Sequence, residues 1–484
     1  MMLRETIEVL PAEQAGAVHF IAIGGAGMSG VAEMYHELGL RVSGCDRSDS
    51  PVLRQLAGAG ISTAIGHNPA HLTGVDTVVV SSAIRDSNPE VVAAKASGLR
   101  IWHRSAALAA LMIGRRGVSV AGTHGKTTTS AMTATMLAHA GVHPSYVIGS
   151  PLAASGRSAQ LGAGDVLVIE ADESDGSFLQ YPTEIAVITN IEADHLDNWG
   201  TPQAYHEGFR DFAHRPSVRS VVINADDPGA RQLADELREA GVVRVVSYGE
   251  APDADYRLTG LRFENTSSGA RLQAEGHSFQ LELQVPGRFN LANATAAFAV
   301  GRLLGVDAAD LLAAARQFTG TLRRFQLVAS QPLSNAPDAA PVRIYDDYAH
   351  HPTELRASLG AALRARGDGR LVACFQPHLY SRTRDFADEF GQALCLADVV
   401  IVTDVYGARE EPMPGISGAL IADAAEAHAE PGTEVHYVPD KRELPDVLAG
   451  LVRGGDLVMT LGAGDVTLVG PLLAAQLKKR AGRE

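Results

Sequence analysis

The sequence predicts a multidomain α/β protein whose domains are built on largely parallel sheets. Short apolar runs alternate with longer helical patterns through most of the chain, as expected for parallel strands joined by crossover helices. Several of these runs end in polar or glycine-rich segments. A chain of 484 residues that is 46% hydrophobic is too long for one ordinary compact domain. We therefore expect two or three domains.

The N-terminal elements have the order of a nucleotide-binding fold. An apolar strand is predicted at Val18–Ile23, followed by a glycine-rich turn, a helix at Met28–Leu38 and a strand at Arg41–Gly44. Val75–Val80 has the composition of a further buried strand. The strand, turn and helix together predict a phosphate-binding crevice at the carboxyl end of the first strand.

The turn itself carries Gly25-Ala26-Gly27-Met28-Ser29-Gly30, and Asp46 follows the next strand. This spacing is typical of a dinucleotide-binding fold. The same glycine geometry binds any nucleotide with a pyrophosphate, so it does not distinguish NAD from a UDP-sugar. Phosphate binding is predicted here, and its ligand stays open.

A second β/α unit begins with a strand at Gly117–Ala121, a short turn and a helix that extends to about Ala140. Asp165–Glu170 and Ile185–Asn190 supply two more apolar strands. Residues 256–285 alternate apolar and polar side chains, which favours an antiparallel edge or flap. Alanine-rich helices then lead to Phe318.

The β/α rhythm restarts after Gly320, which predicts a separate C-terminal domain. Ser330–Pro341 is rich in Pro, Ala, Ser and Asp and is interpreted as a surface loop within it. The predicted strands of this domain are Arg343–Asp347, Leu371–Gln376, Val399–Val405, Glu434–Val438 and Asp456–Leu461.

Composition excludes several functional classes. A formal charge of -15 makes binding to nucleic acid or to an anionic membrane surface an unattractive interpretation. Three cysteines without metal-ligand spacing suit a reducing compartment. No signal peptide or membrane-spanning stretch is evident, so a cytoplasmic location is expected. Composition does not indicate the oligomeric state.

The strongest local motif is Gly122-Thr123-His124-Gly125-Lys126-Thr127-Thr128, between an apolar strand and a helix. Glycines let backbone amides approach phosphates, the helix N-terminus is partly positive, Lys126 adds a cation, and a Thr hydroxyl can reach magnesium. Val120 stands where the usual motif has its first Gly, so the loop is a shortened variant. The alternative is a chance glycine-rich turn.

Magnesium requires further oxygen ligands, usually a carboxylate. Glu170 closes the apolar run 166–169 and so projects from the carboxyl end of a strand, where ligands gather in parallel sheets. Its acidic neighbours could serve a metal or simply form a solvated turn. His195 follows the strand at Ile185–Asn190, and its role stays open between a structural His and a ligand of a second metal.

Three polar clusters lie where a nucleotide and an acceptor could meet. Asn290 and Asn293 open an alanine-rich helix, and their amides could bind an adenine edge or simply cap the helix. Residues 346–352 and 376–382 each follow an apolar strand. Arg could orient a carboxylate there and Tyr or His an amine, although a polar loop is the alternative.

These motifs occur in the order of the Mur ligases, the ATP-dependent amino-acid ligases of peptidoglycan synthesis, and almost the whole chain resembles that family. The resemblance includes His19 to Gly25, the phosphate loop and Glu170 to Asp175. It continues through Asn190 to His195, Asn290 to Asn293, Arg323 to Phe325, Asp346 to Pro352 and Phe375 to Arg384.

The resemblance implies an N-terminal Rossmann-like UDP-binding domain (1–113), a central P-loop ATPase domain (114–320) and a C-terminal Rossmann-like domain (321–484). The last would close over the site and bind the amino acid and ATP. The residues implied in UDP-substrate binding are Gly25, Ala26, Gly27, Met28, Ser29, Asp46, Ser81 and Ser82.

ATP and Mg²⁺ are implied as cofactors, with UDP-N-acetylmuramate and L-alanine as small-molecule substrates. The implied ATP-binding residues are Gly122, Thr123, His124, Gly125, Lys126, Thr127, Thr128, Asn290, Asn293 and Arg324. The implied metal ligands are Thr127, Glu170 and His195. Lys126, His124, His350, His378 and Arg382 are the implied catalytic residues, and Tyr348, His350 and Arg382 would bind the amino acid.

The lack of a central-domain lysine bears on which branch of this family the chain resembles. Several Mur ligases use a carbamoylated lysine in the central domain, whereas this chain has no lysine between Lys126 and Lys441. This favours the alanine-adding branch. Asn198 to Pro202 resemble the family less, which leaves the metal shell open.

Three alternatives stay open. A recycling ligase would add a preformed tripeptide to the same UDP-sugar. An NAD-dependent oxidoreductase would use the first glycine-rich turn but would leave Lys126, Glu170 and the third domain unexplained. A nucleotide-binding regulator without turnover is the third.

Overall fold

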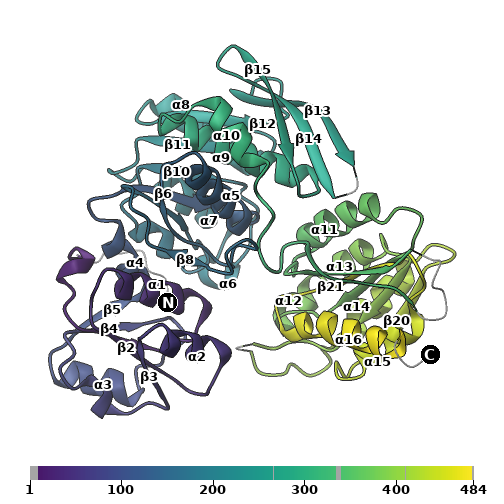
Figure 1. The fold of residues 1–484 in the computed structure, drawn as a ribbon, viewed down its shortest axis with the longest axis horizontal. Helices are drawn as coiled ribbons and strands as arrows, with labels where there is room; N and C mark the ends of the chain where they lie inside the picture. The colour runs from purple at the N-terminus through teal and green to yellow at the C-terminus, as the bar shows by residue number, and fades with distance from the viewer. Residues whose placement is uncertain (1–8, 265, 334–339, 409, 482–484) are drawn as a thin grey trace. The chain divides into compact units, whose positions relative to one another are not determined.

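The computed structural model describes residues 9–264, 266–333, 340–408 and 410–481. The chain forms two compact units (Figure 1). The first extends to residue 260 and also contains residues 270–282 and 291–318. The second contains residues 261–269, 283–290 and those from 319 onward. Among the described residues, no helix is long and apolar enough to cross a membrane.

The first unit begins with a sheet in the order β3-β2-β1-β4-β5, whose paired strands are parallel. The strands are β1 (Val18–Ile21), β2 (Val42–Asp46), β3 (Ser62–Ile65), β4 (Thr77–Val80) and β5 (Arg100–His103). The helices are α1 (Ala26–Glu37), α2 (Pro51–Gly58), α3 (Pro89–Ala96) and α4 (Arg104–Met112). The strand order reverses between β1 and β4, and such a point places a crevice at the carboxyl ends of both strands.

The next sheet has the order β15-β14-β13-β12-β11-β10-β6-β9-β7-β8. Its strands are β6 (Arg116–Ala121), β7 (Ser145–Val147), β8 (Ala159–Gln160), β9 (Val166–Glu170), β10 (Ile185–Ile188), β11 (Ser220–Asn224), β12 (Arg244–Gly249), β13 (Tyr256–Glu264), β14 (Ser267–Ala274) and β15 (His277–Leu283). The helices are α5 (Lys126–His139), α6 (Leu196–Trp199), α7 (Pro202–Ala213), α8 (Pro228–Ala240), α9 (Arg288–Leu303) and α10 (Ala308–Ala315). Because β6 is parallel to both β9 and β10, the carboxyl ends of these three strands meet at one edge.

The second unit contains a sheet in the order β16-β17-β21-β18-β19-β20, parallel except for the antiparallel pair β16–β17. The strands are β16 (Gln326–Gln331), β17 (Val342–Asp347), β18 (Leu371–Phe375), β19 (Val399–Val402), β20 (Glu434–Tyr437) and β21 (Leu457–Leu461). The helices are α11 (Pro352–Ala365), α12 (Tyr380–Asp385), α13 (Ala387–Leu394), α14 (Ala419–His428), α15 (Leu444–Leu451) and α16 (Val469–Ala481).

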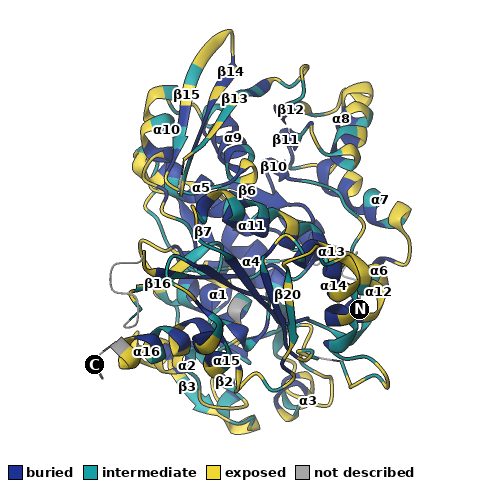
Figure 2. Ribbon diagram, turned by 90° about the vertical axis from the view of Figure 1, so that its right-hand side faces the viewer, coloured by how far each residue is buried: buried dark blue, intermediate teal, exposed yellow. Residues whose placement is uncertain are grey.

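The central strands are buried along nearly their whole length, as expected for parallel sheets covered on both faces. Figure 2 shows exposed residues on the outer faces of helices such as α8 and α16. An aromatic cluster of Phe178, Trp199, Tyr205, Phe209 and Phe212 packs within the first unit. The Tyr205 hydroxyl lies 3.0 Å from Oγ1 of Thr123, so this cluster supports the phosphate loop.

The predicted strands are present, and their ends differ for local reasons. β1 stops at Ile21 rather than Ile23 because Ala22 adopts φ +61° and the chain turns there. β10 stops at Ile188 because Thr189 and Asn190 turn their side chains toward the phosphate loop. In these two cases the sequence pattern extended the strand into the turn that follows, whereas β2 continues past its predicted end at Gly44 to Asp46.

Two predictions concern segments at the edges of the sheets. The alternating segment 256–285 forms β13, β14 and β15, which are neighbours in the sheet (Figure 1). The two-residue connection between β14 and β15 requires that pair to be antiparallel, as predicted. The prediction of a loop at Ser330–Pro341 was wrong for its first two residues, because Ser330 and Gln331 pair with β17 as part of β16. Residues 334–339 of that loop lie outside the described residues.

Candidate active site

The phosphate loop joins β6 to α5. Gly122 has φ +134° and Gly125 has φ +81°, a region that favours glycine. A Cβ added at Gly122 would lie 2.0 Å from Oγ1 of Thr189. The tight turn at residues 122–125 therefore requires a glycine at its first position, and it leads into the N-terminus of α5 where phosphate binding is favourable.

Residues that follow β10 hold this loop in place. The backbone N–H of His124 donates to Oδ1 of Asn190 at 2.8 Å, and Nδ2 of Asn190 donates to the His124 carbonyl at 3.0 Å. Oγ1 of Thr123 donates to the Glu192 carbonyl at 2.8 Å and accepts from its N–H at 3.0 Å. The His124 ring lies 3.1 Å from the Glu192 carboxylate. His124 thus contributes to the frame of the loop.

The Lys126 ammonium is held inside this loop. Nζ donates to the carbonyls of Gly122 at 2.6 Å and Thr123 at 3.0 Å, and to Oε1 of Glu173 at 3.1 Å. Burial disfavours the charged ammonium, but the surrounding carboxylates outweigh burial and raise the pKa of Lys126. The lysine is therefore a fixed positive charge.

Glu173 is the buried partner of that charge. Its side chain is 1% exposed, and Oε2 lies 2.9 Å from Nζ of Lys126. Burial raises the pKa of Glu173 to about 7, although Lys126 opposes the shift. Sequence reasoning grouped Glu173 with a general acidic run. The sequence did contain one indication of its role, because Glu173 lies three residues after the end of β9, the strand that borders β6.

Glu170 and Thr127 form an oxygen-rich corner beside the loop. Oγ1 of Thr127 donates to Oε1 of Glu170 at 3.0 Å, and the Gly149 N–H donates to Oε2 at 2.7 Å. Thr127 is buried in the first turn of α5, and Thr128 beside it is half-buried. A hydroxyl and a carboxylate are donors that Mg²⁺ accepts. Gly149 was not selected from the sequence.

His195 lies near two carboxylates, those of Glu173 and Asp194. Its Nε2 is 3.9 Å from Oε1 of Glu173 and 3.6 Å from Oδ2 of Asp194. The residue has φ +54° and directly precedes α6. The negative charge of these two carboxylates favours a cation near the imidazole.

The glycine-rich turn after β1 is shaped by Asp46 and Arg104. The Gly24 N–H donates to Oδ2 of Asp46 at 3.0 Å. A Cβ added at Gly27 would lie 2.4 Å from Nη1 of Arg104, so a larger residue there would have to displace that guanidinium. Gly25 precedes α1, which begins at Ala26. Met28 and Ser29 are buried, which leaves the backbone of this turn as its accessible part.

Ser81 and Ser82 follow β4, at the other side of the switch point. Ser81 is half-buried and Ser82 is exposed. Oγ of Ser82 donates to Oδ2 of Asp175 at 3.1 Å and lies 3.0 Å from Nε2 of His103. Asp172 lies 3.7 Å from Arg104. The acidic segment after β9 therefore contacts both parts of the N-terminal crevice.

Asn290 and Asn293 fall on α9 but in different units. In the first unit, a Cβ at Gly125 would lie 3.2 Å from Oδ1 of Asn293, so this buried amide is close to the phosphate loop. In the second unit, Nδ2 of Asn290 donates to the Pro286 carbonyl at 2.6 Å.

In the second unit, two arginines that precede β16 lie beside the polar residues that follow β17. The guanidinium groups of Arg323 and Arg324 lie 4.8 Å and 5.2 Å from the centre of the Tyr348 ring. The His350 ring is 5.3 Å from that of Tyr348, and its Nδ1 is 3.1 Å from Glu354. Cationic and aromatic groups suited to a phosphate or an amino acid thus meet at one strand end.

His378 and Arg382 follow β18. The His378 ring lies 5.7 Å from that of His350 and stacks on Tyr406 at 5.9 Å. Arg382 is buried in α12. The structure therefore brings Tyr348, His350 and His378 together and places Arg382 four residues after His378, in α12.

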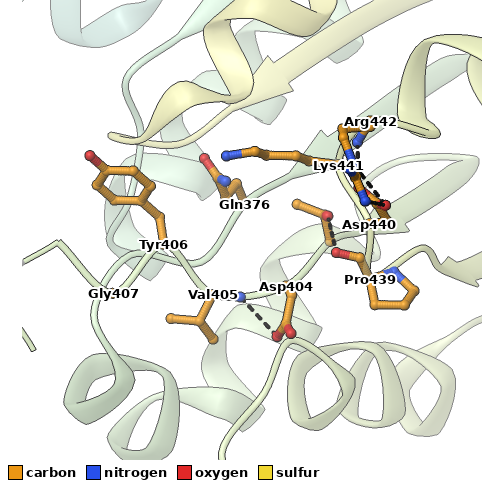
Figure 3. A pocket seen from close by; sticks show the side chains of 10 residues that line it. Gln376, Asp404, Val405, Tyr406, Gly407, Pro439, Asp440, Lys441 and Arg442 are labelled. Carbon is orange, nitrogen blue, oxygen red and sulfur yellow. Dashed lines mark hydrogen bonds and ion pairs between the residues drawn. The ribbon is translucent and has the colours of Figure 1, made fainter. Parts of the chain in front are cut away.

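A neighbouring pocket of about 580 Å³ was not predicted from the sequence (Figure 3). It lies where β18, β19 and β20 end. Lys441 forms an ion pair with Asp465, whose Oδ1 accepts from Nε2 of Gln376 at 2.9 Å. The lining residues are Gln376, Thr403, Asp404, Val405, Tyr406, Gly407, Pro439, Asp440, Lys441 and Arg442. Lys441 was the one indication of this pocket in the sequence, because the chain contains few lysines.

Three family models match consecutive parts of the chain. Residues 17–116 match the Mur ligase family catalytic domain, residues 120–301 the Mur ligase middle domain, and residues 323–464 the Mur ligase glutamate ligase domain. Together these matches cover most of the sequence in the order of the three sheets.

Full-length relatives agree with the family models. The chain is 62% identical to UDP-N-acetylmuramate--L-alanine ligase of Cutibacterium acnes, over 99% of this chain and 100% of that protein. It is 47% identical to the enzyme of the same name from Paenarthrobacter aurescens, over 98% and 99%. A crystal structure of UDP-N-acetylmuramate-alanine ligase from Thermotoga maritima superposes with a TM-score of 0.80 at 29% identity, covering 96% of this chain and 99% of that one.

Proposed function

The chain belongs to the Mur ligase family, and we propose that it joins L-alanine to UDP-N-acetylmuramate in an ATP-dependent reaction. The observation that carries the ATP-dependent step is the convergence of the phosphate loop, Lys126 and the Thr127–Glu170 pair where β6 and β9 end. The choice of substrates is supported by the names of relatives that match nearly every residue of the chain.

The proposed chemistry starts from an unreactive acid. A carboxylate resists attack by an amine because oxide would have to leave. Transfer of the ATP γ-phosphate to the lactyl carboxylate of the muramate gives an acyl phosphate and ADP. The amine of L-alanine then attacks the acyl carbon, a proton leaves the nitrogen, and the tetrahedral intermediate expels phosphate to form the amide.

Lys126 supplies the fixed charge for the first step. Its bonds to two loop carbonyls can be exchanged for bonds to phosphate oxygens. Phosphoryl transfer depends mainly on positioning and charge stabilisation, so one rigid ammonium beside the γ-phosphate favours the transition state. His124, packed on Glu192, keeps the loop in the shape that accepts the phosphates.

The donors around the loop fit Mg²⁺. Oγ1 of Thr127 and Oε1 of Glu170 lie 3.0 Å apart and are both oxygens, and His195 adds a nitrogen beside Glu173. Thr127 and Glu170 would hold one ion, with His195 as a further ligand. Bound there, magnesium would neutralise charge on the ATP phosphates.

The remaining residues bind and orient. The turn at Gly25–Ser29, with Asp46, Ser81 and Ser82, would bind the UDP part at the switch point. Thr123, Gly125 and Thr128 would bind ATP phosphates with the rest of the loop. Asn290 and Asn293 would contact adenine, and Arg324 a phosphate. Tyr348, His350, His378 and Arg382 would hold the amino acid.

The proposed surroundings follow from these reactants. ATP and a UDP-sugar are cytoplasmic metabolites, so the enzyme would act in the cytoplasm on small molecules, with no role for nucleic acid or a membrane. The reaction would supply precursor for peptidoglycan and so support the cell wall, cell shape and cell division.

Phosphate release from ATP and magnesium tests the proposal. Release should require both UDP-N-acetylmuramate and L-alanine, and the alanyl product should appear by mass spectrometry. Glycine, L-serine and the recycling tripeptide serve as competing acceptors. Release only with the tripeptide would assign the chain to the recycling branch, and absence of turnover with every acceptor would contradict ligase function.

A further inference from the structure

Four metal-ligand side chains meet within the N-terminal part of the first unit, away from the phosphate loop. They are His19 in β1, Cys45 in β2, His71 in a short 3-10 helix (Pro69–Leu72) and Glu90 in α3. One ligand atom from each residue lies within 4.8 Å of all the others. The proposed ligase reaction uses none of them.

The fold explains how residues far apart in sequence converge. Ile21 of β1 lies opposite Cys45 of β2, and side chains alternate along a strand, so His19 and Cys45 point to the same face of the sheet. Glu90 in the first turn of α3 faces them from the helix that packs there. His71 completes the group because the 3-10 helix packs against α3.

Glu90 is the centre of the cluster and is completely buried. Its Oε2 accepts from Sγ of Cys45 at 2.9 Å, and its Oε1 lies 2.7 Å from Nδ1 of His71 and 3.6 Å from Nε2 of His19. Three side chains of metal-ligand type thus surround one buried carboxylate inside the domain.

His19 provides an independent observation. Its Nδ1 lies 2.9 Å from the Ser43 hydroxyl, while Nε2 is buried and, among the described residues, has no hydrogen-bond partner. Nε2 lies 3.6 Å from Oε1 of Glu90, which is too far for a hydrogen bond and close to the spacing of two ligands on one metal ion.

We propose that His19, Cys45, His71 and Glu90 form a binding site for a thiophilic divalent cation of the zinc type. Tetrahedral zinc with bonds of about 2.0 to 2.3 Å has ligand atoms about 3.3 to 3.7 Å apart, so shifts of about an ångström complete the site. Binding releases the Cys45 thiol proton to solvent and leaves a thiolate, two neutral imidazoles and a carboxylate on the ion. A thiolate in this set selects zinc over magnesium.

A path for the ion exists on the histidine side. His71 is 25% exposed, and His67, whose Nδ1 lies 3.2 Å from both Cys45 and Glu90, is 22% exposed. His19, Cys45 and Glu90 are inaccessible. The ion enters between the two partly exposed imidazoles and is then surrounded by buried ligands, which favours slow release.

Cobalt titration of the full-length chain tests this site without ATP or either substrate, so its outcome is independent of the proposed ligase function. The protein is first treated with chelator, reduced, and supplied with excess Mg²⁺ to occupy oxygen-rich sites. Co²⁺ is then added while the thiolate-to-cobalt charge-transfer absorption is followed. One equivalent should produce the band, and Zn²⁺ should remove it by displacement.

Two variants and one control assign the ligands. Cys45→Ser should lose the band, and His71→Gln, at a partly exposed position that tolerates change, should weaken Co²⁺ binding by at least about tenfold. Cys395→Ser alters a half-buried thiol in the second unit and should behave as the wild type. Absence of a band in the wild-type protein, or unchanged binding in folded His71→Gln, would show a metal-free hydrogen-bonded network and overturn the proposal.

Discussion

At the scale of single residues, the environment of Lys126 combines two loop carbonyls with one buried carboxylate, all within 3.1 Å of Nζ. Carbonyl oxygens and phosphate oxygens are interchangeable acceptors for an ammonium, whereas Glu173 keeps the side chain aligned when the other partners change. The charge is therefore positioned before ATP arrives.

Lys126→Ala should reduce acyl-phosphate formation by about 10²- to 10³-fold, the usual effect of removing one charge-stabilising donor from a transition state. UDP-sugar binding should be unchanged because the turn at residues 24–30 is separate from the phosphate loop. Single-turnover transfer from labelled ATP and calorimetry with UDP-N-acetylmuramate measure the two effects.

Lys95→Ala is the matched control, since Lys95 is exposed and pairs only on the surface with Asp86. It should leave both measurements unchanged. An equal loss of UDP-sugar binding in Lys126→Ala would show that the two sites are not separate.

Glu173 gives a pH-dependent prediction for the protein without ATP and magnesium. Its pKa is raised to about 7, so its contribution to stability is fully present below the ordinary value of a glutamate and is lost as pH rises through 7. Glu173→Gln cannot titrate. Its free energy of unfolding should therefore rise relative to wild type between pH about 4.5 and 7, by at most about 1.4 kcal/mol per pH unit.

Urea denaturation of both proteins across this range measures the difference. A difference that stays constant with pH would contradict the raised pKa of Glu173.

These residues also show what the sequence could predict. Lys126 was evident because it stands in a motif and because the next lysine is Lys441. Glu173 was not, since composition does not reveal which carboxylate of the segment 170–175 turns inward. That choice depends on the loop after β9 and on Trp199, whose Nε1 donates to the Glu173 carbonyl at 3.0 Å.

At the scale of secondary-structure elements, the loop between β6 and α5 depends on backbone space at its first residue. Gly122→Ala would place a methyl group against Thr189 and impose φ +134° on an L-residue, which costs about 1 to 3 kcal/mol in strain alone. We expect weaker ATP binding and lower stability. Equilibrium binding of an ATP analogue and chemical denaturation measure both.

Gly58→Ala is the control for that substitution. Gly58 ends α2, and a Cβ added there would have no other atom within 4 Å, so alanine should be neutral or stabilise by up to about 1 kcal/mol. Wild-type ATP affinity in Gly122→Ala would show that the loop accommodates a side chain.

Element boundaries show a second limit of sequence reasoning. Apolar periodicity predicted β9 and β10, because buried parallel strands consist of consecutive apolar residues. It could not predict that Ser330 and Gln331 form part of β16, since that strand is partly exposed and its antiparallel pairing with β17 is a long-range interaction.

At the scale of the whole molecule, the β/α rhythm predicted parallel sheets and the strand ends at which polar residues gather. It could not predict the cluster of His19, Cys45, His71 and Glu90, because these residues come from four separate elements and lack the short spacing of familiar metal motifs. Convergence of this kind depends on sheet register and helix packing.

Both glycine-rich turns belong to the first unit, so each nucleotide should stabilise that unit by mass action. At a free concentration of 100 times its dissociation constant, either UDP-N-acetylmuramate or an ATP analogue should add about 2.7 kcal/mol to its free energy of unfolding. Denaturation with each ligand measures this. In Lys126→Ala the increment from the ATP analogue should shrink while that from the UDP-sugar persists.

Because the chain contains few lysines, the half-buried Lys126 is also useful for chemical footprinting. An amine-acylating reagent has few targets on this chain, and the tryptic peptides between Lys126 and Lys441 contain none of them. Acylation at Lys126 would be slow because its side chain is only 16% exposed and its ammonium is ion-paired, and a bound nucleotide would slow it further. Mass spectrometry of that one site would therefore follow occupation of the phosphate loop, with the exposed Lys95 as the internal reference in the same sample.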